Sequence, residues 1–278
     1  MPELPEVETI VRGLSPKIKG LRVESFKMFL PTILRTGNVF LLRKLRGKSV
    51  TQVCRRGKMI LIEFEDDLCL LFHLKMTGSL LFCPRKDPYD KHVHFLLVFK
   101  GQEKELRFRD VRKFGFVSCV PSSDIHLSEE LRNLGPEPLE IGYLRFEEIL
   151  KKRKARIKSL LLDQNFIAGI GNIYADEILF EARIHPLTSA SLLKKKDKER
   201  LWKAMREVLQ KAIEKRGSSI QDYRDDEGRQ GTFQNLHQAY GREDLPCSRC
   251  GEKIERLRLN ARSSFFCPNC QIFKEKHP

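Results

Sequence analysis

The sequence predicts an α+β protein: an N-terminal helix with an antiparallel β-sandwich, then a helical region, then a C-terminal zinc-binding β-hairpin. Three observations predict this fold class. Strand-like apolar segments fill the first part of the 278 residues, helical periodicity begins after Leu134-Gly135-Pro136-Glu137-Pro138, and two cysteine pairs lie near the C-terminus. We therefore expect domains at residues 1–133 and 145–235, a linker at 134–144, and a zinc finger at 236–278.

The first helix is predicted from Pro5, which suits a first-turn position, and from the apolar residues that follow it. Val7, Ile10, Val11 and Leu14 fall at i, i+3, i+4 and i+7, so one face packs on another element. Apolar segments separated by Gly, Asp and Lys turn signals predict strands at residues 21–29, 49–54, 59–64, 68–74, 95–99 and 106–108.

Residues 145–216 are expected to carry at least three helices, the last from about Lys196 to Lys215 with Gly217 as its stop. The segment 165–172, NFIAGIGN, is too glycine-rich to continue a helix, so a helix, a turn and a second helix are expected there. A helix that begins near Asn172 would present free N–H groups to an anion such as a DNA phosphate. A tight turn that serves only packing explains the glycines equally well.

The cysteine spacing predicts a metal site. Cys247-x2-Cys250 is followed by sixteen residues and then by Cys267-x2-Cys270, and four soft donors on two tight turns suit tetrahedral Zn²⁺. Disulfides are the alternative, but nothing in the sequence suggests an oxidising compartment. Cys54, Cys69, Cys83 and Cys119 are scattered among apolar residues and are expected to be reduced.

The charge balance points to an anionic partner. There are 52 Lys and Arg against 37 Asp and Glu, a net charge of +15, while 41% hydrophobic residues and 18 Phe exclude a disordered polycation. A basic folded surface attracts nucleic acid or an anionic membrane. No apolar stretch is long enough to span a membrane and no signal peptide is recognisable, so we expect a cytoplasmic protein. The basic clusters at 151–158 and 194–196 contact phosphates or are merely solvated.

The N-terminus carries unusual chemistry. Removal of Met1 would expose the secondary amine of Pro2 beside Glu3 and Glu6. An α-amine has a pKa of about 7.7 to 8.0, so part of it is an unprotonated nucleophile near neutrality. Condensation with an aldehyde would give a cationic iminium, an electron sink, and the glutamates could shuttle protons. A proline-capped helix start with acidic first-turn residues explains the same sequence without catalysis.

Three distant motifs in order resemble the bacterial formamidopyrimidine-DNA glycosylase family: MPELPEVET, LLDQNFIAGIGNIYADEILF and CSRCGEKIERLRLNARSSFFCPNCQ. The resemblance covers the whole chain. It implies a helix-two-turn-helix in the central region and a monomeric, nucleoid-associated enzyme that binds damaged double-stranded DNA. Such an enzyme is a bifunctional DNA glycosylase and AP lyase that excises 8-oxoguanine and formamidopyrimidines. Leu4 favours this purine branch over the endonuclease VIII type, which acts on oxidised pyrimidines.

The resemblance also implies roles for individual residues. Pro2 would be the nucleophile, Glu3 the acid that assists opening of the deoxyribose ring, and Lys58 a turn lysine that contacts phosphate and assists elimination. Glu6 matches a further acidic position. The remaining matched positions would contact DNA: His73, Asn172 and Arg262 at phosphates beside the active site, Met76, Arg112 and Phe114 in the space vacated by the extruded nucleotide, and His92 nearby.

Residues 218–223 match a segment that covers the damaged base. Val93, Ala261 and Ser219 depart from the residues that are frequent at their positions, which leaves the lesion preference open. A non-catalytic zinc protein that binds DNA would also fit the charge, the helical turn and the cysteines. Pro2 with Glu3 distinguishes the two, because a binding protein has no need of a free imino terminus.

Overall fold

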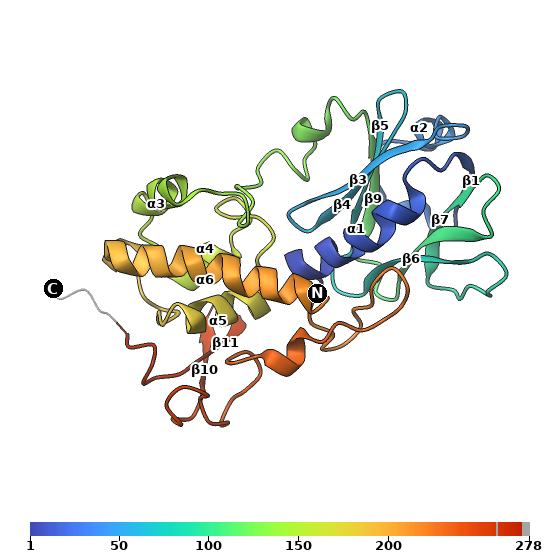
Figure 1. Ribbon diagram of the computed structural model, residues 1–278. Coiled ribbons are helices and arrows are strands. Elements are labelled where there is room, and N and C mark those ends of the chain that lie inside the picture. The colour runs from blue at the N-terminus through green and yellow to red at the C-terminus, as the bar shows by residue number, and fades with distance from the viewer. Residues whose placement is uncertain (260, 274–278) are drawn as a thin grey trace. The chain divides into compact units, whose positions relative to one another are not determined.

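The computed structural model describes residues 1–259 and 261–273, which form two compact units (Figure 1). The first unit comprises Met1–Asn133 and Lys215–Thr232, and the second comprises Leu134–Glu214 and the chain from Phe233 onward. Each unit is described separately below.

Helix α1 (Leu4–Ile18) confirms the predicted N-terminal helix. It begins at the N-cap Glu3, whose backbone N–H donates to the carboxylate of Glu6 at 2.7 Å in a capping box. The predicted apolar face, which includes Val7, Ile10 and Leu14, is fully buried. The start of the chain is therefore fixed by its own acidic side chains.

Two sheets enclose the core of the first unit. A four-stranded sheet has the order β1-β7-β8-β6 and a five-stranded sheet the order β2-β9-β5-β4-β3. The strands are β1 (Val23–Met28), β2 (Leu34–Thr36), β3 (Val50–Arg56), β4 (Met59–Phe64), β5 (Leu68–His73), β6 (Gly78–Pro84), β7 (Val93–Phe99), β8 (Lys104–Asp110) and β9 (Phe116–Val120). The ring of Phe72 in one sheet lies 6.0 Å from Phe95 and 5.8 Å from Phe108 in the other. These contacts confirm the sandwich.

The antiparallel prediction holds for the sheet pairs of this unit except one, because β2 pairs parallel with β9. Strands β2, β6 and β9 were not predicted, nor were the short helices η1 (Pro31–Ile33), α2 (Val39–Arg43) and η2 (Ile125–Leu127). Strand β2 has only three residues, and β6 contains Gly78 and Pro84, which weaken a strand signal.

Residues 215–232 lie against α1 within the first unit. The backbone N–H of Ser218 donates to Glu6 at 2.7 Å, and the hydroxyl of Tyr223 donates to the backbone carbonyl of Glu6 at 3.2 Å. Farther along, Lys17 contacts Asp226 at 2.5 Å, and the backbone carbonyl of Asp226 accepts from Phe82 in β6. The segment is thus attached to both the helix and a sheet.

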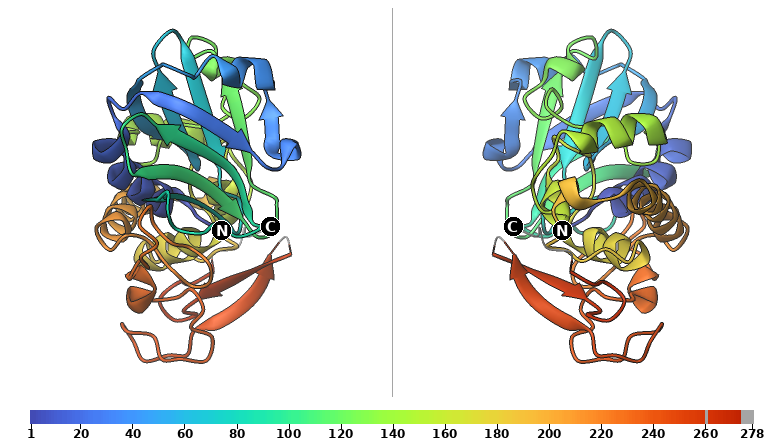
Figure 2. Two further views of the ribbon diagram at one scale, coloured as in Figure 1. Left: turned by 90° about the vertical axis from the view of Figure 1, so that its right-hand side faces the viewer. Right: turned by 90° about the vertical axis from the view of Figure 1, so that its left-hand side faces the viewer.

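The second unit contains the predicted helices and the hairpin. Its elements are α3 (Tyr143–Lys151), α4 (Ile157–Leu162), α5 (Asn172–Glu181), η3 (Ala190–Leu192), α6 (Lys195–Glu214), η4 (Phe233–Leu236), β10 (Glu255–Leu259) and β11 (Arg262–Phe266). Figure 2 shows β10 and β11 as a red antiparallel ribbon. The glycine-rich turn between α4 and α5 is braced by Gln164, whose amide donates to Leu162 and Ile170 and accepts from Gly169.

The four scattered cysteines are unpaired thiols, as expected. Cys69 and Cys119 are buried, and burial raises the pKa of Cys119 to about 12. None of the helices in the described residues is long and apolar enough to cross a membrane.

Candidate active site

Pro2, Glu3 and Glu6 lie together at the N-terminal end of α1. Pro2 is buried behind a half-exposed Met1, and Glu3 and Glu6 are 3% and 1% exposed. One carboxylate oxygen of Glu6 accepts from Glu3 and the other from Ser218, both at 2.7 Å. Removal of Met1 would place a secondary amine next to two fixed acids.

Lys58 occupies a two-residue turn between β3 and β4, where Arg56 pairs with Met59. Gly57 precedes it with φ +55°, a conformation that L side chains rarely adopt, so glycine suits this turn position. Arg55 attaches the turn to α1, because its Nε donates to Glu8 at 2.9 Å and its Nη1 to the carbonyl of Gly57 at 3.1 Å. Lys58 is 8% exposed, so it is largely buried at this turn.

Glu8 is the carboxylate that accepts the hydrogen bond from Arg55. Burial opposes its ionisation, but hydrogen bonds from Arg12 and Arg55 keep the pKa of Glu8 below its ordinary value. Neither Arg55 nor Glu8 was expected to have a role. Their pairing joins α1 to β3 across 47 residues of sequence, so no local pattern could predict it.

His73 ends β5 as a neutral hydrogen-bond donor. Its Nδ1 accepts the backbone N–H of Lys75 at 3.0 Å, which leaves the proton of the neutral ring on Nε2. Burial, together with the positive charges of Lys75, Lys58 and Arg35, lowers the pKa of His73 to about 3. The structure therefore brings Lys58 and His73 into the same basic environment.

This environment is centred on the ring of Phe116. The guanidinium of Arg35 lies 4.7 Å from the ring centroid, the ammonium of Lys75 lies 5.5 Å away, and the His73 ring lies 5.5 Å away. Burial and the charge of Arg35 lower the pKa of Lys75. A group of cations around a neutral donor is suited to bind an anion.

Met76, Arg112 and Phe114 form an exposed cluster. One guanidinium nitrogen of Arg112 lies 3.1 Å from the Met76 sulfur, and the guanidinium carbon lies 4.8 Å from the centroid of the Phe114 ring. Met76 is 43% and Phe114 54% exposed, so neither side chain belongs to the core. His92 lies beside the strand that leads into this cluster, because its backbone carbonyl accepts from the backbone N–H of Asp110, the last residue of β8, at 2.9 Å.

In the second unit, Asn172 contacts the hairpin that carries Arg262. Asn172 is the first residue of α5, and its side-chain amide donates at 3.0 Å to the carbonyl of Ser263, which directly follows the exposed Arg262. The ammonium of Lys158 donates to the same carbonyl at 2.9 Å. The hairpin that carries Arg262 is therefore attached to the helix that Asn172 begins.

Lys158 corrects one sequence expectation. It was grouped with the basic cluster at 151–158, but it is fully buried and forms an ion pair with Asp176 at 2.6 Å. Burial raises the pKa of Asp176 above its ordinary value, against the opposing effect of the Lys158 charge. Lys158 is thus an internal anchor of the hairpin and not a surface cation.

Cys247, Cys250, Cys267 and Cys270 form the metal centre. Their sulfur atoms all lie within 4.8 Å of one another, with Cys250 and Cys267 3.5 Å apart and Cys247 and Cys270 4.0 Å apart. Zn–S bonds of about 2.3 Å imply sulfur separations of about 3.8 Å in a tetrahedron. Backbone N–H groups of Arg249 and Cys270 donate to Cys247 and Cys267 sulfurs at 3.4 Å. The donor set fits one zinc ion, as predicted.

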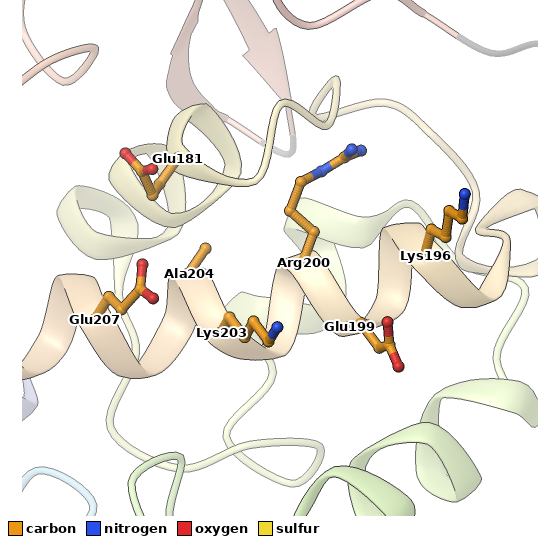
Figure 3. A pocket seen from close by; sticks show the side chains of 7 residues that line it. All are labelled: Glu181, Lys196, Glu199, Arg200, Lys203, Ala204 and Glu207. Carbon is orange, nitrogen blue, oxygen red and sulfur yellow. The ribbon is translucent and has the colours of Figure 1, made fainter.

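A pocket of about 270 Å³ lies between α5 and α6 (Figure 3). Figure 3 shows side chains of both charges around it, with Glu181 from α5 and Lys196, Glu199, Arg200, Lys203 and Glu207 from α6. None of the predicted site residues lines this pocket.

Comparison with protein-family models covers most of the chain. Residues 1–117 match the formamidopyrimidine-DNA glycosylase N-terminal domain, residues 134–224 match the H2TH domain of the same family, and residues 244–272 match a zinc finger found in FPG and IleRS.

Individual proteins match over their full lengths. Formamidopyrimidine-DNA glycosylase of Desulforamulus reducens is 44% identical over 278 residues, 99% of this chain and 100% of the relative. A Lactococcus lactis Fpg structure with DNA that contains N7-benzyl-Fapy-dG is 37% identical, with a TM-score of 0.90 and coverage of 98% and 100%. The same enzyme was also solved with DNA that contains an oxidised pyrimidine, at 36% identity, a TM-score of 0.89 and coverage of 98% and 100%.

Proposed function

The chain belongs to the formamidopyrimidine-DNA glycosylase family, and from this premise we propose that it excises oxidised purines from duplex DNA and then cleaves the strand at the abasic site. The observation that carries the proposal is the buried group of Pro2, Glu3 and Glu6 at the start of α1. Membership in the family makes the chain a DNA glycosylase. The lyase step and the choice of lesion are the proposed parts.

The reaction begins with extrusion of the damaged nucleotide, since the sugar of a stacked nucleotide is not accessible. Once Met1 is removed, the nitrogen of Pro2 attacks C1′ of the deoxyribose, and the bond from C1′ to the base breaks. The base leaves with the bonding electrons and takes up a proton, and the Pro2 nitrogen loses its own proton. Glu3 donates a proton to the ring oxygen, which breaks the bond from C1′ to that oxygen, opens the sugar and leaves a cationic iminium between Pro2 and C1′. The carboxylate of Glu6, held by Glu3 and Ser218, keeps the start of α1 in place.

The iminium then withdraws electrons from C2′ and acidifies its proton. Loss of this proton expels the 3′ phosphate in a β-elimination and leaves an unsaturated iminium. Loss of the C4′ proton then expels the 5′ phosphate in a δ-elimination. Hydrolysis of the iminium releases the sugar fragment and regenerates the amine. The gap therefore carries phosphates at both ends, and these steps need no metal ion.

Phosphate binding is proposed for groups on both units. Lys58 supplies a charge and His73 an N–H donor in the first unit, while Asn172 and Arg262 supply an amide and a guanidinium in the second. Zinc bound by the four cysteines stabilises the hairpin of Arg262. We propose that the protein acts as a cytoplasmic monomer on damaged double-stranded DNA.

The oxidised-pyrimidine alternative is supported by one observation. The Lactococcus lactis enzyme was solved both with Fapy-dG derivatives and with an oxidised pyrimidine in the DNA, so this architecture accommodates both. Leu4 favours the purine reading only through resemblance. Lesion preference must therefore be measured directly.

The test is single-turnover cleavage of duplexes that contain 8-oxoguanine, a formamidopyrimidine or an oxidised pyrimidine, with analysis of the product ends. We expect the purine lesions to react faster and both gap ends to carry phosphate. Glu3→Gln should slow excision by about 100-fold or more, since general acid catalysis contributes on this scale. Glu24→Gln, at an exposed carboxylate of β1, is the matched control. Faster excision of the pyrimidine lesion, or wild-type rates for Glu3→Gln, would contradict the proposal.

A further inference from the structure

Asp110 is a buried carboxylate at the end of β8 to which the proposed mechanism gives no role. It is fully buried, and both of its oxygens accept hydrogen bonds. One accepts from the hydroxyl of Thr77 and from the backbone of Arg112, the latter at 3.2 Å, and the other accepts from the backbone of Gly115 at 2.7 Å. Its donors therefore belong to two separate loops.

These loops are the turn at 74–77, between β5 and β6, and the loop at 111–115, between β8 and β9. Thr77 connects them a second time, because its oxygen also accepts the backbone N–H of Arg112 at 3.1 Å. The strand register places Gly78 directly opposite Asp110. A Cβ atom at Gly115 would lie 2.7 Å from the Phe108 ring and 3.0 Å from the Asp110 carboxylate, so the loop fits closely over this group.

Burial of a carboxylate is unfavourable unless donors replace its lost hydration. Donors from both loops replace the lost hydration of the Asp110 carboxylate, so both loops are attached to this one carboxylate. Lys113, in the middle of the second loop, has φ +58°, a conformation that persists only where surrounding contacts fix it. The hydrogen bonds at Arg112 and Gly115 flank this residue and supply that constraint.

The three exposed side chains Met76, Arg112 and Phe114 project from these two loops. Arg112 contacts both of the others, so the cluster is assembled in the protein without DNA. A group that is ordered before binding avoids the entropy loss of ordering it in the complex. Rigid attachment of the loops would therefore keep the three side chains in a fixed arrangement when the cluster enters a duplex.

We propose that Asp110 is a positioning residue that joins the two loops into one rigid wedge, so that Met76, Arg112 and Phe114 enter the DNA together. This inference rests on the proposed function, because it requires these side chains to fill the space of an extruded nucleotide. Asp110 contacts neither the substrate nor the reacting atoms. It acts through Thr77 and the loop backbone.

The experiment follows duplex opening by stopped-flow fluorescence of 2-aminopurine placed beside 8-oxoguanine. Thr77→Val removes the bridging hydroxyl at nearly constant shape, and Thr77→Ser keeps it. We expect Thr77→Val to slow opening by about tenfold, on the scale of a lost hydrogen bond to a charged group, and Thr77→Ser to restore it. Cleavage of a preformed abasic site in single-stranded DNA should be unchanged. Thr77→Val should lower the melting temperature, because a buried carboxylate loses one of its donors, and Thr77→Ser should restore it, so opening is measured well below the melting transition. Ser79→Ala, which removes a hydroxyl from the adjoining strand β6, is the matched control.

Phe114→Ala separates failure of this inference from failure of the proposed function. If Phe114→Ala does not slow opening, the cluster does not fill the vacated space, and the role that the family resemblance implies for these side chains is wrong. If Phe114→Ala slows opening but Thr77→Val and a folded Asp110→Asn do not, the positioning role is wrong. In the double variant Thr77→Val/Phe114→Ala we expect little further loss beyond Phe114→Ala, because the two residues act as one unit. Fully additive losses would overturn the proposal.

Discussion

At the scale of single residues, His73 is neutral in the folded protein because burial and three nearby cations disfavour its charged form. With its pKa at about 3, the imidazole should not titrate between pH 5 and 8. NMR of the His73 ring protons over this range should show constant chemical shifts. A midpoint near 6.5 would contradict the burial of this ring.

The same shift predicts how stability depends on pH. Between about pH 6.5 and pH 3 the unfolded chain holds a proton on His73 that the folded protein does not, so this residue lowers stability as the pH falls through that window. His73→Gln should reduce the slope of unfolding free energy against pH by up to one proton. An identical slope in urea titrations of both proteins would show that the shift is absent.

The exposure of Phe114, at 54%, predicts that its side chain contributes to DNA recognition and not to stability. Phe114→Ala should leave the melting temperature nearly unchanged, whereas truncation of a core Phe costs about 3 to 5 kcal/mol. Base stacking on an aromatic ring is worth about 1 to 3 kcal/mol, so discrimination of lesion from normal duplex should weaken by this amount. Lower thermal stability with normal discrimination would exclude the wedge.

The sequence predicted which residues belong to the candidate site, but it did not predict which residues contact them. Resemblance supplied Pro2, Lys58 and Phe114 because short motifs carry them. Ser218 meets Glu6 across 212 residues, and Asp110 meets Thr77 across 33, and no local pattern encodes such pairs. The side chains that position the candidate site could therefore be identified only from the three-dimensional structure.

At the scale of elements, regular periodicity was predictive. Helix α6 and strands β4 and β5 lie within one or two residues of their expected bounds, because apolar spacing and turn residues define them. Strand β2 was missed because three residues form no pattern, and its parallel pairing with β9 depends on distant chain segments. Local sequence determines the elements here, and long-range packing determines the exceptions.

The zinc hairpin carries a prediction about metal removal. Chelation of zinc, or Cys250→Ala, should unfold β10 and β11, since metal binding and folding are coupled in such sites. The unfolded hairpin cannot present Arg262 beside Asn172, so DNA affinity should fall. Metal analysis, circular dichroism and a binding titration check this. Active protein without zinc, or full binding by Cys250→Ala, would contradict it.

At the scale of the whole molecule, the net charge of +15 predicts that duplex binding weakens steeply with salt, because each neutralised phosphate releases counterions. Arg262→Ala should reduce the slope of log affinity against log salt by about one. Arg145→Ala is the control, since this arginine of α3 pairs with Glu148 at 2.6 Å. Equal slopes for Arg262→Ala and the parent protein would make Arg262 a structural residue.

The central claim is that the amine of Pro2 forms the covalent intermediate. The most direct measurement is borohydride trapping on an 8-oxoguanine duplex, since hydride reduces the iminium to a stable amine, followed by peptide mapping of the adduct. Intact mass first establishes that Met1 has been removed. The account predicts an adduct on Pro2 that Glu3→Gln suppresses. An adduct on Lys58 or another lysine, with full trapping retained by Pro2→Gly, would contradict it.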